Sequence, residues 1–228
     1  MEIRFFFLCL LPVVLEALAP AEEFFDVLGT GLKEWRLVFR GTAYINKSMY
    51  VAYKDGSNVP AVVRDTCRQT NWSQPCDTHY RNADALNNWN NIMEVLFGVI
   101  DRGQLVKTAV FKGDHTSYMN WLSEGHYINS SWPDLNGQHP HIYGIKGDDG
   151  LRRRFFISHN YNGCSNDAGW VVVVDRLNVP CDWEKDEAFP IIKYAAAEKF
   201  ENWNTGNFRN ADGIAVFVKY SGGSSIVG

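Results

Sequence analysis

The loop from Asn160 to Trp170 gathers the side chains of this chain that are best suited to binding chemistry. Its eleven residues include amide and carboxylate oxygens, two glycines, a cysteine and two aromatic rings. Such oxygens can hydrogen-bond sugar hydroxyls or ligate calcium, and an aromatic ring can stack on a sugar. The candidate ligand-binding residues are therefore Asn160, Asn162, Asn166, Asp167 and Trp170. The competing interpretation is a tight turn, built from Asn, Asp and Gly, that ends on a core tryptophan.

Catalytic signatures are absent from the sequence. It has no Gly-x-Ser-x-Gly nucleophile motif, no His-Glu-x-x-His zinc motif, no phosphate-binding glycine loop with lysine and no dinucleotide fingerprint. The motif His139-Pro140-His141 could place two imidazoles on one face of a strand, but no third zinc ligand is evident, so an exposed turn is favoured. The acidic run 182–187 is expected to be a solvated face rather than a catalytic carboxylate pair. We predict no catalytic residues and no enzyme activity.

The run Arg152-Arg153-Arg154 is a second candidate, for sulfated glycans. On a strand the middle arginine would face away from the other two, which dilutes any basic patch. We therefore expect a solvent-exposed hairpin next to the acidic pair Asp148-Asp149.

The first twenty-one residues predict the compartment in which these groups work. A basic residue, Arg4, lies in an apolar run that extends to Leu15, and Ala19-Pro20-Ala21 follows with the small residues that signal peptidase requires. This layout predicts a secretory signal peptide over residues 1–21, too short for a membrane span. The rest of the chain would then fold in an oxidising, glycosylating environment.

The cysteines and sequons fit that environment. Cys9 would leave with the signal, so Cys67, Cys76, Cys164 and Cys181 remain, and four cysteines allow three connectivities. The local pairs Cys67–Cys76 and Cys164–Cys181 are favoured because each closes a short loop. Glycan acceptors of the form Asn-x-Ser are found at Asn46, Asn71 and Asn129.

Charge and hydropathy limit the partners. The formal net charge of the whole chain is −4, which gives no support to nucleic-acid binding. After the signal no apolar run approaches the length of a transmembrane span, and we expect none.

Short alternating runs separated by turns predict an all-β fold. Strands are expected at 35–40, 49–53, 94–100, 105–112, 141–146, 151–160, 170–175, 191–194 and 213–220, and one poor helix at 82–91. The four consecutive valines at 171–174 are typical of a strand buried on both faces. No linker divides the chain. We therefore predict an N-terminal segment (22–34), a single antiparallel β-sandwich, jelly-roll-like (35–220), and a flexible tail (221–228).

An ordered series of motifs resembles a family of secreted marine-invertebrate domains, similar to those of coral and shell organic matrices. The series comprises Leu37-Val38-Phe39-Arg40-Gly41-Thr42-Ala43, Arg152 to Phe156, Asn160-Tyr161-x-Gly163-Cys164, Gly169-Trp170, Val174-Asp175, Cys181-x-Trp183-Glu184, Asn202-Trp203-Asn204-x-Gly206, Ala211-Asp212 and Val216-Phe217-Val218-Lys219. The resemblance covers about Trp35 to Tyr220. It implies adhesion or matrix work and supplies no catalytic residues. Asn162 stands where the family pattern has Gly, which leaves the ligand of that loop open.

The sequence thus predicts a secreted, disulfide-bonded glycoprotein that binds an extracellular glycan or matrix component, either as a matrix protein or as a lectin-like domain. It predicts no required cofactor, with calcium as an alternative ligand of the loop. A secreted glycan hydrolase and a venom or toxin component are the other functions compatible with the sequence.

Overall fold

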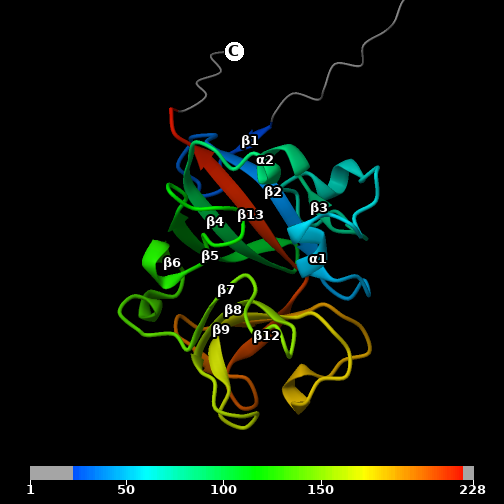
Figure 1. Cartoon of the computed structure of the whole chain (residues 1–228), viewed down its shortest axis with the longest axis vertical. Helices are drawn as coiled ribbons and strands as arrows, with labels where there is room; N and C mark the ends of the chain where they lie inside the picture. The colour runs from blue at the N-terminus through cyan, green and yellow to red at the C-terminus, as the bar shows by residue number, and fades with distance from the viewer. Residues whose placement is uncertain (1–22, 223–228) are drawn as a thin grey trace, which may run out of the picture.

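Two antiparallel β-sheets form the protein in a computed structural model that describes residues 23–222 (Figure 1). The predicted signal peptide, 1–21, and tail residues 223–228 lie outside the described residues.

The first sheet has seven strands, in the order β1-β2-β13-β4-β5-β6, with β3 paired to β2. Its strands are β1 (Phe24–Phe25), β2 (Trp35–Thr42), β3 (Tyr80–Arg81), β4 (Ile92–Asp101), β5 (Gln104–Lys112), β6 (Tyr127–Ser130) and β13 (Gly213–Tyr220). The second sheet has six, in the order β12-β10-β9-β8-β7, with β11 paired to β9. Its strands are β7 (Ile142–Gly144), β8 (Arg153–Asn160), β9 (Ala168–Val174), β10 (Ile191–Ala195), β11 (Glu201–Asn202) and β12 (Phe208–Ala211).

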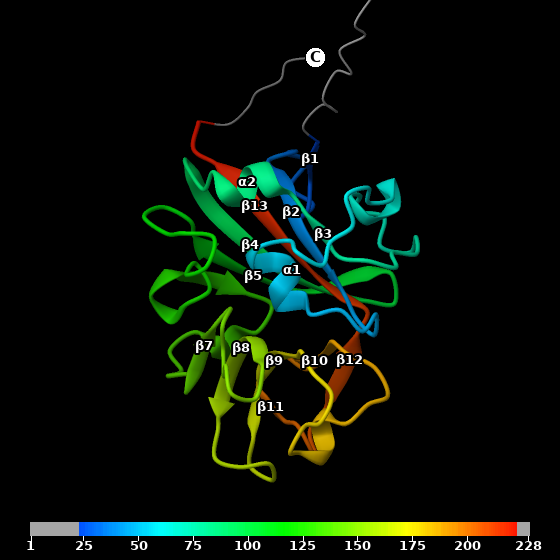
Figure 2. The ribbon, with the colours of Figure 1, turned by 45° about the vertical axis from the view of Figure 1, so that its right-hand side comes forward.

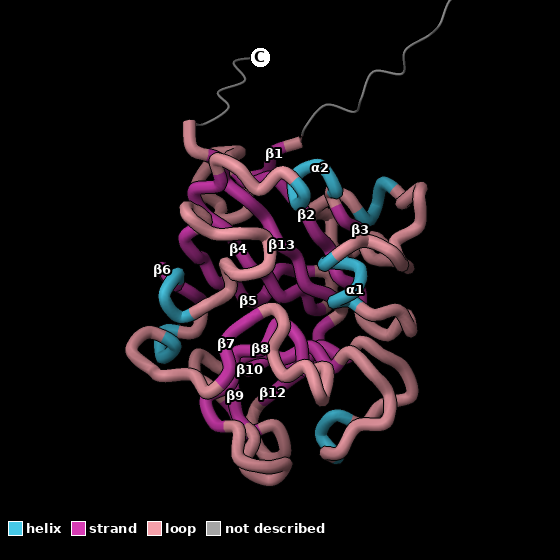
Figure 3. Tube along the Cα trace, in the orientation of Figure 1, coloured by secondary structure: helices cyan, strands magenta, loops and turns pink. Residues whose placement is uncertain are grey.

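The few helical segments are short and lie around the strands (Figure 3). They are α1 (Met49–Lys54), α2 (Ala83–Asn87) and four 3-10 turns at Asp65–Cys67, Glu124–His126, Pro133–Leu135 and Asp182–Glu184. Within the described range no helix has the length and apolar character needed to cross a membrane.

An aromatic column joins the two sheets. The Phe155 ring, from β8, stacks on Phe39 of β2 and on Phe97 of β4, with ring centroids 6.3 and 6.2 Å apart, and Tyr53 of α1 meets it edge-on at 5.3 Å. All four rings are fully buried. Offset and edge-on contacts of this kind add to the free energy of apolar burial. The all-β prediction with two packed antiparallel sheets is therefore confirmed.

The strands predicted at 94–100 and 105–112, and those at 141–146 and 151–160, pair as two hairpins. Strands β4 and β5 pair across the two-residue turn Arg102-Gly103, in which both residues have positive φ (52° and 69°), as the tightest hairpin turns require. Strands β7 and β8 pair around residues 147–150. The valine run lies in β9, which is buried along its whole length between β8 and β10.

The predicted strand at 49–53 is wrong, because these residues form helix α1. Ser48 caps the helix by accepting a hydrogen bond from the Val51 N–H. The Asp175 carboxylate, at the end of β9, accepts hydrogen bonds from the Ser48 hydroxyl and from the Met49 and Tyr50 N–H groups. A contact from the other sheet thus selects a helix where local alternation indicates a strand.

Other element boundaries also differ from the predictions. Only Ala83–Asn87 of the predicted helix 82–91 is helical, capped by the Asn82 side chain. The N-terminal segment 22–34 contributes β1, which pairs with β2 of the first sheet.

The arginine run is not an exposed patch. Arg152 is exposed, whereas Arg153 and Arg154 are buried. The register of β8 against β9 shifts after Arg154, and Phe155 adopts a positive φ of 41°. This bulge turns Arg154 and Phe155 toward α1 and the first sheet, where Arg154 lies over the Tyr50 ring, while Arg153 turns to the opposite face.

Both local disulfides are present, Cys67–Cys76 and Cys164–Cys181. They close loops of 9 and 17 residues in sequence separation, so each restricts its own segment rather than linking distant parts of the fold. Trp183 packs with Cys181 in the apolar cluster on the outer face of the second sheet, whereas Trp170 belongs to the core between the sheets.

A buried histidine makes the stability of this fold dependent on pH. The Nδ1 atom of His79 accepts a hydrogen bond from the Thr42 N–H at 3.1 Å, and its Nε2 lies 3.0 Å from the Lys47 carbonyl. Burial lowers the pKa of His79 to about 4, a shift that the Lys47 carbonyl opposes and the charge of Lys47 reinforces. As pH falls, His79 therefore binds a proton near pH 6.5 in the unfolded chain but only near pH 4 in the folded chain.

We predict that the free energy of unfolding decreases as pH falls from 6.5 to 4, by about 3 kcal/mol from this residue, because each pKa unit corresponds to about 1.4 kcal/mol. Urea unfolding at several pH values measures the slope. The variant H79Q should lose most of it, while H115Q, at a side chain that is 94% exposed, should keep it. Equal slopes in the wild type and H79Q would contradict the assignment.

Candidate functional site

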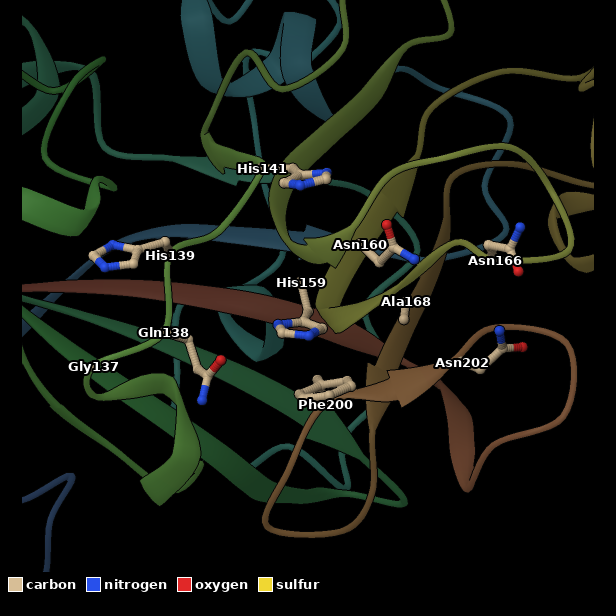
Figure 4. A pocket seen from close by; sticks show the side chains of 10 residues that line it. All are labelled: Gly137, Gln138, His139, His141, His159, Asn160, Asn166, Ala168, Phe200 and Asn202. Carbon is tan, nitrogen blue, oxygen red and sulfur yellow. The ribbon is translucent and has the colours of Figure 1, made fainter.

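A cleft of about 650 Å³ opens where one end of the second sheet meets the loop before β7. It is lined by Gly137, Gln138, His139, His141, His159, Asn160, Asn166, Ala168, Phe200 and Asn202 (Figure 4). Two of the predicted ligand-binding residues, Asn160 and Asn166, are therefore brought together in one concave surface. This is the candidate site.

Different strands supply its walls. His159 and Asn160 end β8, and Ala168 begins β9, so the chain reverses at the cleft through the loop that carries Asn166. Phe200 and Asn202 come from the segment of β11, which pairs with β9 at Ala168 and Gly169. The segment 137–141 forms the opposite wall, as Figure 4 shows.

The floor of the cleft is an aromatic stack held by one carboxylate. The rings of His159 and Phe200 are nearly parallel, with centroids 3.7 Å apart, and Trp170 meets both edge-on from below. Asp134 accepts a hydrogen bond from the Trp170 indole N–H at 2.7 Å and another from the Phe200 backbone N–H at 2.8 Å. One side chain therefore fixes both rings that enclose His159.

His159 is suited to a neutral hydroxyl partner. Burial lowers its pKa, the negative charge of Asp134 opposes that shift, and His141 adds to it. A neutral imidazole has one donor nitrogen and one acceptor nitrogen, and either can pair with a sugar hydroxyl, whose oxygen both donates and accepts hydrogen bonds. The Nδ1 atom of His159 is buried and has no hydrogen-bond partner among the described residues. A group entering from the cleft could provide it.

His141 presents a donor at the rim. Its Nδ1 accepts a hydrogen bond from the Tyr161 backbone N–H at 3.1 Å, which leaves the proton of the neutral ring on Nε2. His139 pairs instead with Glu124, at 3.1 Å on the exposed surface.

The amides of the cleft divide into two groups. The side chains of Gln138, Asn160 and Asn166 form no hydrogen bond within the described structure, so they are available to a ligand. Asn202 is already committed, because its amide donates to the Ser165 carbonyl and its oxygen accepts from the N–H groups of Asn204 and Thr205. Together with Asn204, whose amide donates to the Cys164 carbonyl, it holds the loop in place.

Asp167 and Trp170 lie in the interior rather than at the site, which corrects their assignment as ligand-binding residues. Trp170 is fully buried, so its ring cannot stack on a sugar. Asp167 is only 1% exposed and its carboxylate pairs with Arg153 at 3.0 Å. Asn162 is exposed but does not line the cleft.

Arg153 organises the interior behind the loop. Its guanidinium makes two hydrogen bonds of 2.7 Å to the Glu184 carboxylate and lies over the rings of Trp183 and Tyr161. Burial by itself would lower the pKa of Arg153, but the hydrogen bonds and charge of Glu184, with Tyr161 and Asp167, raise it instead. The prediction of a solvated acidic run at 182–187 is therefore wrong at Glu184, which is 1% exposed.

The one carboxylate of the predicted loop, Asp167, is already paired with Arg153. Within the part of the chain that the structure describes, no three His, Cys, Asp or Glu side chains converge as ligands. A calcium site in the predicted loop would need the Asp167 carboxylate, which Arg153 already occupies.

Sequence reasoning missed several residues of the cleft. His139 and His141 carried a signal as a spaced pair, and His159 adjoins the predicted Asn160. Asn202 stood out only as part of a motif, and Gln138 and Phe200 carried no signal; strand pairing brings Asn202 to the cleft and the Asp134 contact brings Phe200 there.

Comparisons of the chain with protein-family models, with curated proteins and with solved structures returned no match. The function of the protein is therefore inferred from the geometry of the cleft.

We predict that D167A destabilises the protein by about 1–3 kcal/mol, because it leaves one buried N–H group of Arg153 without its acceptor while Glu184 still balances the charge. The matched control N166A removes the neighbouring exposed side chain and should change the free energy of unfolding by no more than about 0.5 kcal/mol. Chemical denaturation of both variants makes the comparison. A D167A protein as stable as N166A would show that the Arg153 cluster does not hold the loop.

Proposed function

We propose that this protein is a secreted glycoprotein that binds extracellular carbohydrate, without catalysis, in the cleft over His159 and Phe200. The observation that carries the proposal is the pairing of a stacked ring platform with unpartnered amides, Gln138, Asn160 and Asn166, on the walls around it. Sugars offer hydroxyl groups to such amides and C–H faces to such rings.

The charges around the cleft favour a neutral ligand and a binding role. The lining residues, all within the described part of the chain, include no carboxylate, lysine or arginine. Hydrolysis of a glycoside usually needs two carboxyl groups flanking the bond. Asp134, behind the stack, is occupied by the Trp170 and Phe200 N–H groups, and Glu124 pairs with His139 on the exposed surface. These features support binding over the alternative of a glycan hydrolase.

Secretion is supported by the covalent structure. Both disulfides are formed, which suits an oxidising compartment. The sequon residues Asn46, Asn71 and Asn129 are all exposed, so a glycosyltransferase could reach them. A matrix or adhesion role, which the resemblance implies, is compatible with a carbohydrate-binding surface.

We predict that the double variant N160A/N166A loses carbohydrate binding by tenfold or more while its melting temperature stays within about 2 °C of the wild type. The reason is that these side chains have no partner within the described protein, so removing them costs contacts to ligand only. A glycan array followed by calorimetry on the best ligand measures binding.

The matched control is N162A, an exposed asparagine of the same loop that does not line the cleft. It should bind as the wild type does, and EDTA should change neither protein. Binding that survives in N160A/N166A would place the carbohydrate site elsewhere, and the absence of any array ligand for the wild type would contradict the proposed function.

Expression in a secretory host tests the glycoprotein assignment. We expect a mass above that of the polypeptide, a reduction on enzymatic deglycosylation, and one glycan fewer in N129Q, whose residue projects from the exposed edge strand β6. Mass spectrometry gives the occupancy of each sequon. A wild-type protein of unmodified mass would contradict the assignment.

A further inference from the structure

A second cleft, of about 470 Å³, lies on the first sheet, away from the residues of the candidate site. It is formed by the end of β2, the segment of the Cys67–Cys76 disulfide and the turn between β4 and β5, which adjoin on one side of the molecule (Figure 2). The turn and the disulfide segment are in direct contact: a Cβ atom at Gly103 would lie 3.0 Å from the Ser73 Cα. The turn and the disulfide segment, which form two walls of this cleft, are therefore packed against each other.

Arg40 is the unusual residue in this second cleft. It is only 6% exposed, yet no carboxylate lies within ion-pair distance of its guanidinium among the described residues. One of its terminal nitrogens donates to the Thr66 carbonyl at 2.8 Å, and its plane lies 5.2 Å from the centre of the Trp72 ring. Burial lowers the pKa of Arg40 to about 10, only partly offset by the negative charge of Asp212. A buried cation without an ion-pair partner costs free energy unless an anion meets it.

Arg102 supplies a second positive charge at the mouth. It is exposed, at the tip of the β4–β5 hairpin, and it also lines the cleft. The one carboxylate of the lining, Asp212, accepts the Arg102 backbone N–H at 2.7 Å, so it is partly used in holding the turn. Two arginines and one aspartate leave the cleft with one net positive charge.

We propose that this second cleft binds the sulfate ester of an extracellular glycan, with Arg40 at its base and Arg102 at its mouth. Guanidinium groups present planar pairs of N–H donors that suit oxyanions. One net positive charge balances a singly charged sulfate ester better than a doubly charged phosphate monoester. The rings of Tyr44 and Trp72, which also line the cleft, offer surfaces for the sugar that carries the sulfate.

This assignment differs from that of the candidate site in both charge and location. The candidate site has no arginine or lysine in its lining, whereas the second cleft contains two arginines. It also replaces the arginine run 152–154 as the place where a sulfated ligand would bind, since Arg153 and Arg154 are already paired with carboxylates whereas Arg40 is not.

Calorimetry on the enzymatically deglycosylated full-length protein tests the proposal with three probes: a chondroitin sulfate hexasaccharide, the same hexasaccharide after chemical desulfation, and sodium phosphate. Deglycosylation matters because the sequon at Asn71 adjoins the lining residues Trp72 and Ser73. We expect the sulfated probe to bind at least tenfold more tightly than the other two, and its affinity to fall as salt rises.

Two variants and one control locate the site. R102Q should weaken binding of the sulfated probe about tenfold, because it removes one charge-assisted contact and leaves the fold intact. R40M should abolish binding, and its melting temperature shows whether it is folded. The control R152Q changes an exposed arginine with nearly the same backbone φ (55° against 52°) in a turn of the other sheet, and it should bind within twofold of the wild type.

Each opposite result overturns the proposal. Equal binding of the desulfated probe would show that uronate carboxylates or hydroxyl groups are recognised, and equal binding of phosphate would show a general anion site. Wild-type affinity in R102Q, whose fold does not depend on the replaced side chain, would remove the site from this cleft. The N160A/N166A variant should keep full affinity for the sulfated probe, which separates this test from that of the proposed function.

Discussion

The buried guanidinium of Arg153 is the interaction on which the candidate site depends. It joins three parts of the chain: its own strand β8, the loop before β9 through Asp167, and the turn at 182–184 through Glu184. The Cys164–Cys181 disulfide ties the same loop to the same turn covalently. A loop rich in Asn, Asp and Gly would otherwise have many accessible conformations. Anchoring it from behind allows Asn166 to face the cleft without using its own side chain for structure.

The bulge in β8 makes this arrangement compatible with the packing of the sheets. Consecutive residues of a regular strand point to opposite faces. With the register shift after Arg154, Arg153 can point outward to Asp167 and Glu184. Phe155 then points inward to Phe39 and Phe97. The same strand then ends at His159 and Asn160, so the geometry of the cleft follows from the packing of the core.

The arginines of the chain show how little a one-dimensional charge pattern says about surface potential. Two arginines of the conspicuous triplet at 152–154 are paired with carboxylates: Arg153 with the buried Glu184 and Asp167, and Arg154 with the exposed Asp149. Arg40 and Arg102, far apart in sequence, both line the second cleft, whose lining contains a single carboxylate. The two clefts consequently differ in chemistry: one is a neutral surface of rings and amides, and the other carries a positive charge.

The sequence by itself determined the features that arise from local interactions. Both hairpins, the buried valine strand and the two short-range disulfides follow from turn residues, alternation and loop length, which act within some twenty residues. Asn160 and Asn166 were also identified, because a loop of that composition is polar wherever it lies. Tertiary structure decided the rest. The Asp175 carboxylate binds the first turn of helix α1, where alternation had indicated a strand. Arg153 pairs with Asp167 in the interior, so Asp167 does not line the candidate site. Asp134 accepts the Phe200 N–H, which holds the Phe200 ring against His159. In each case a carboxylate takes a partner from another strand, helix or loop, and the free energy of that pairing depends on burial that only the packed sheets create.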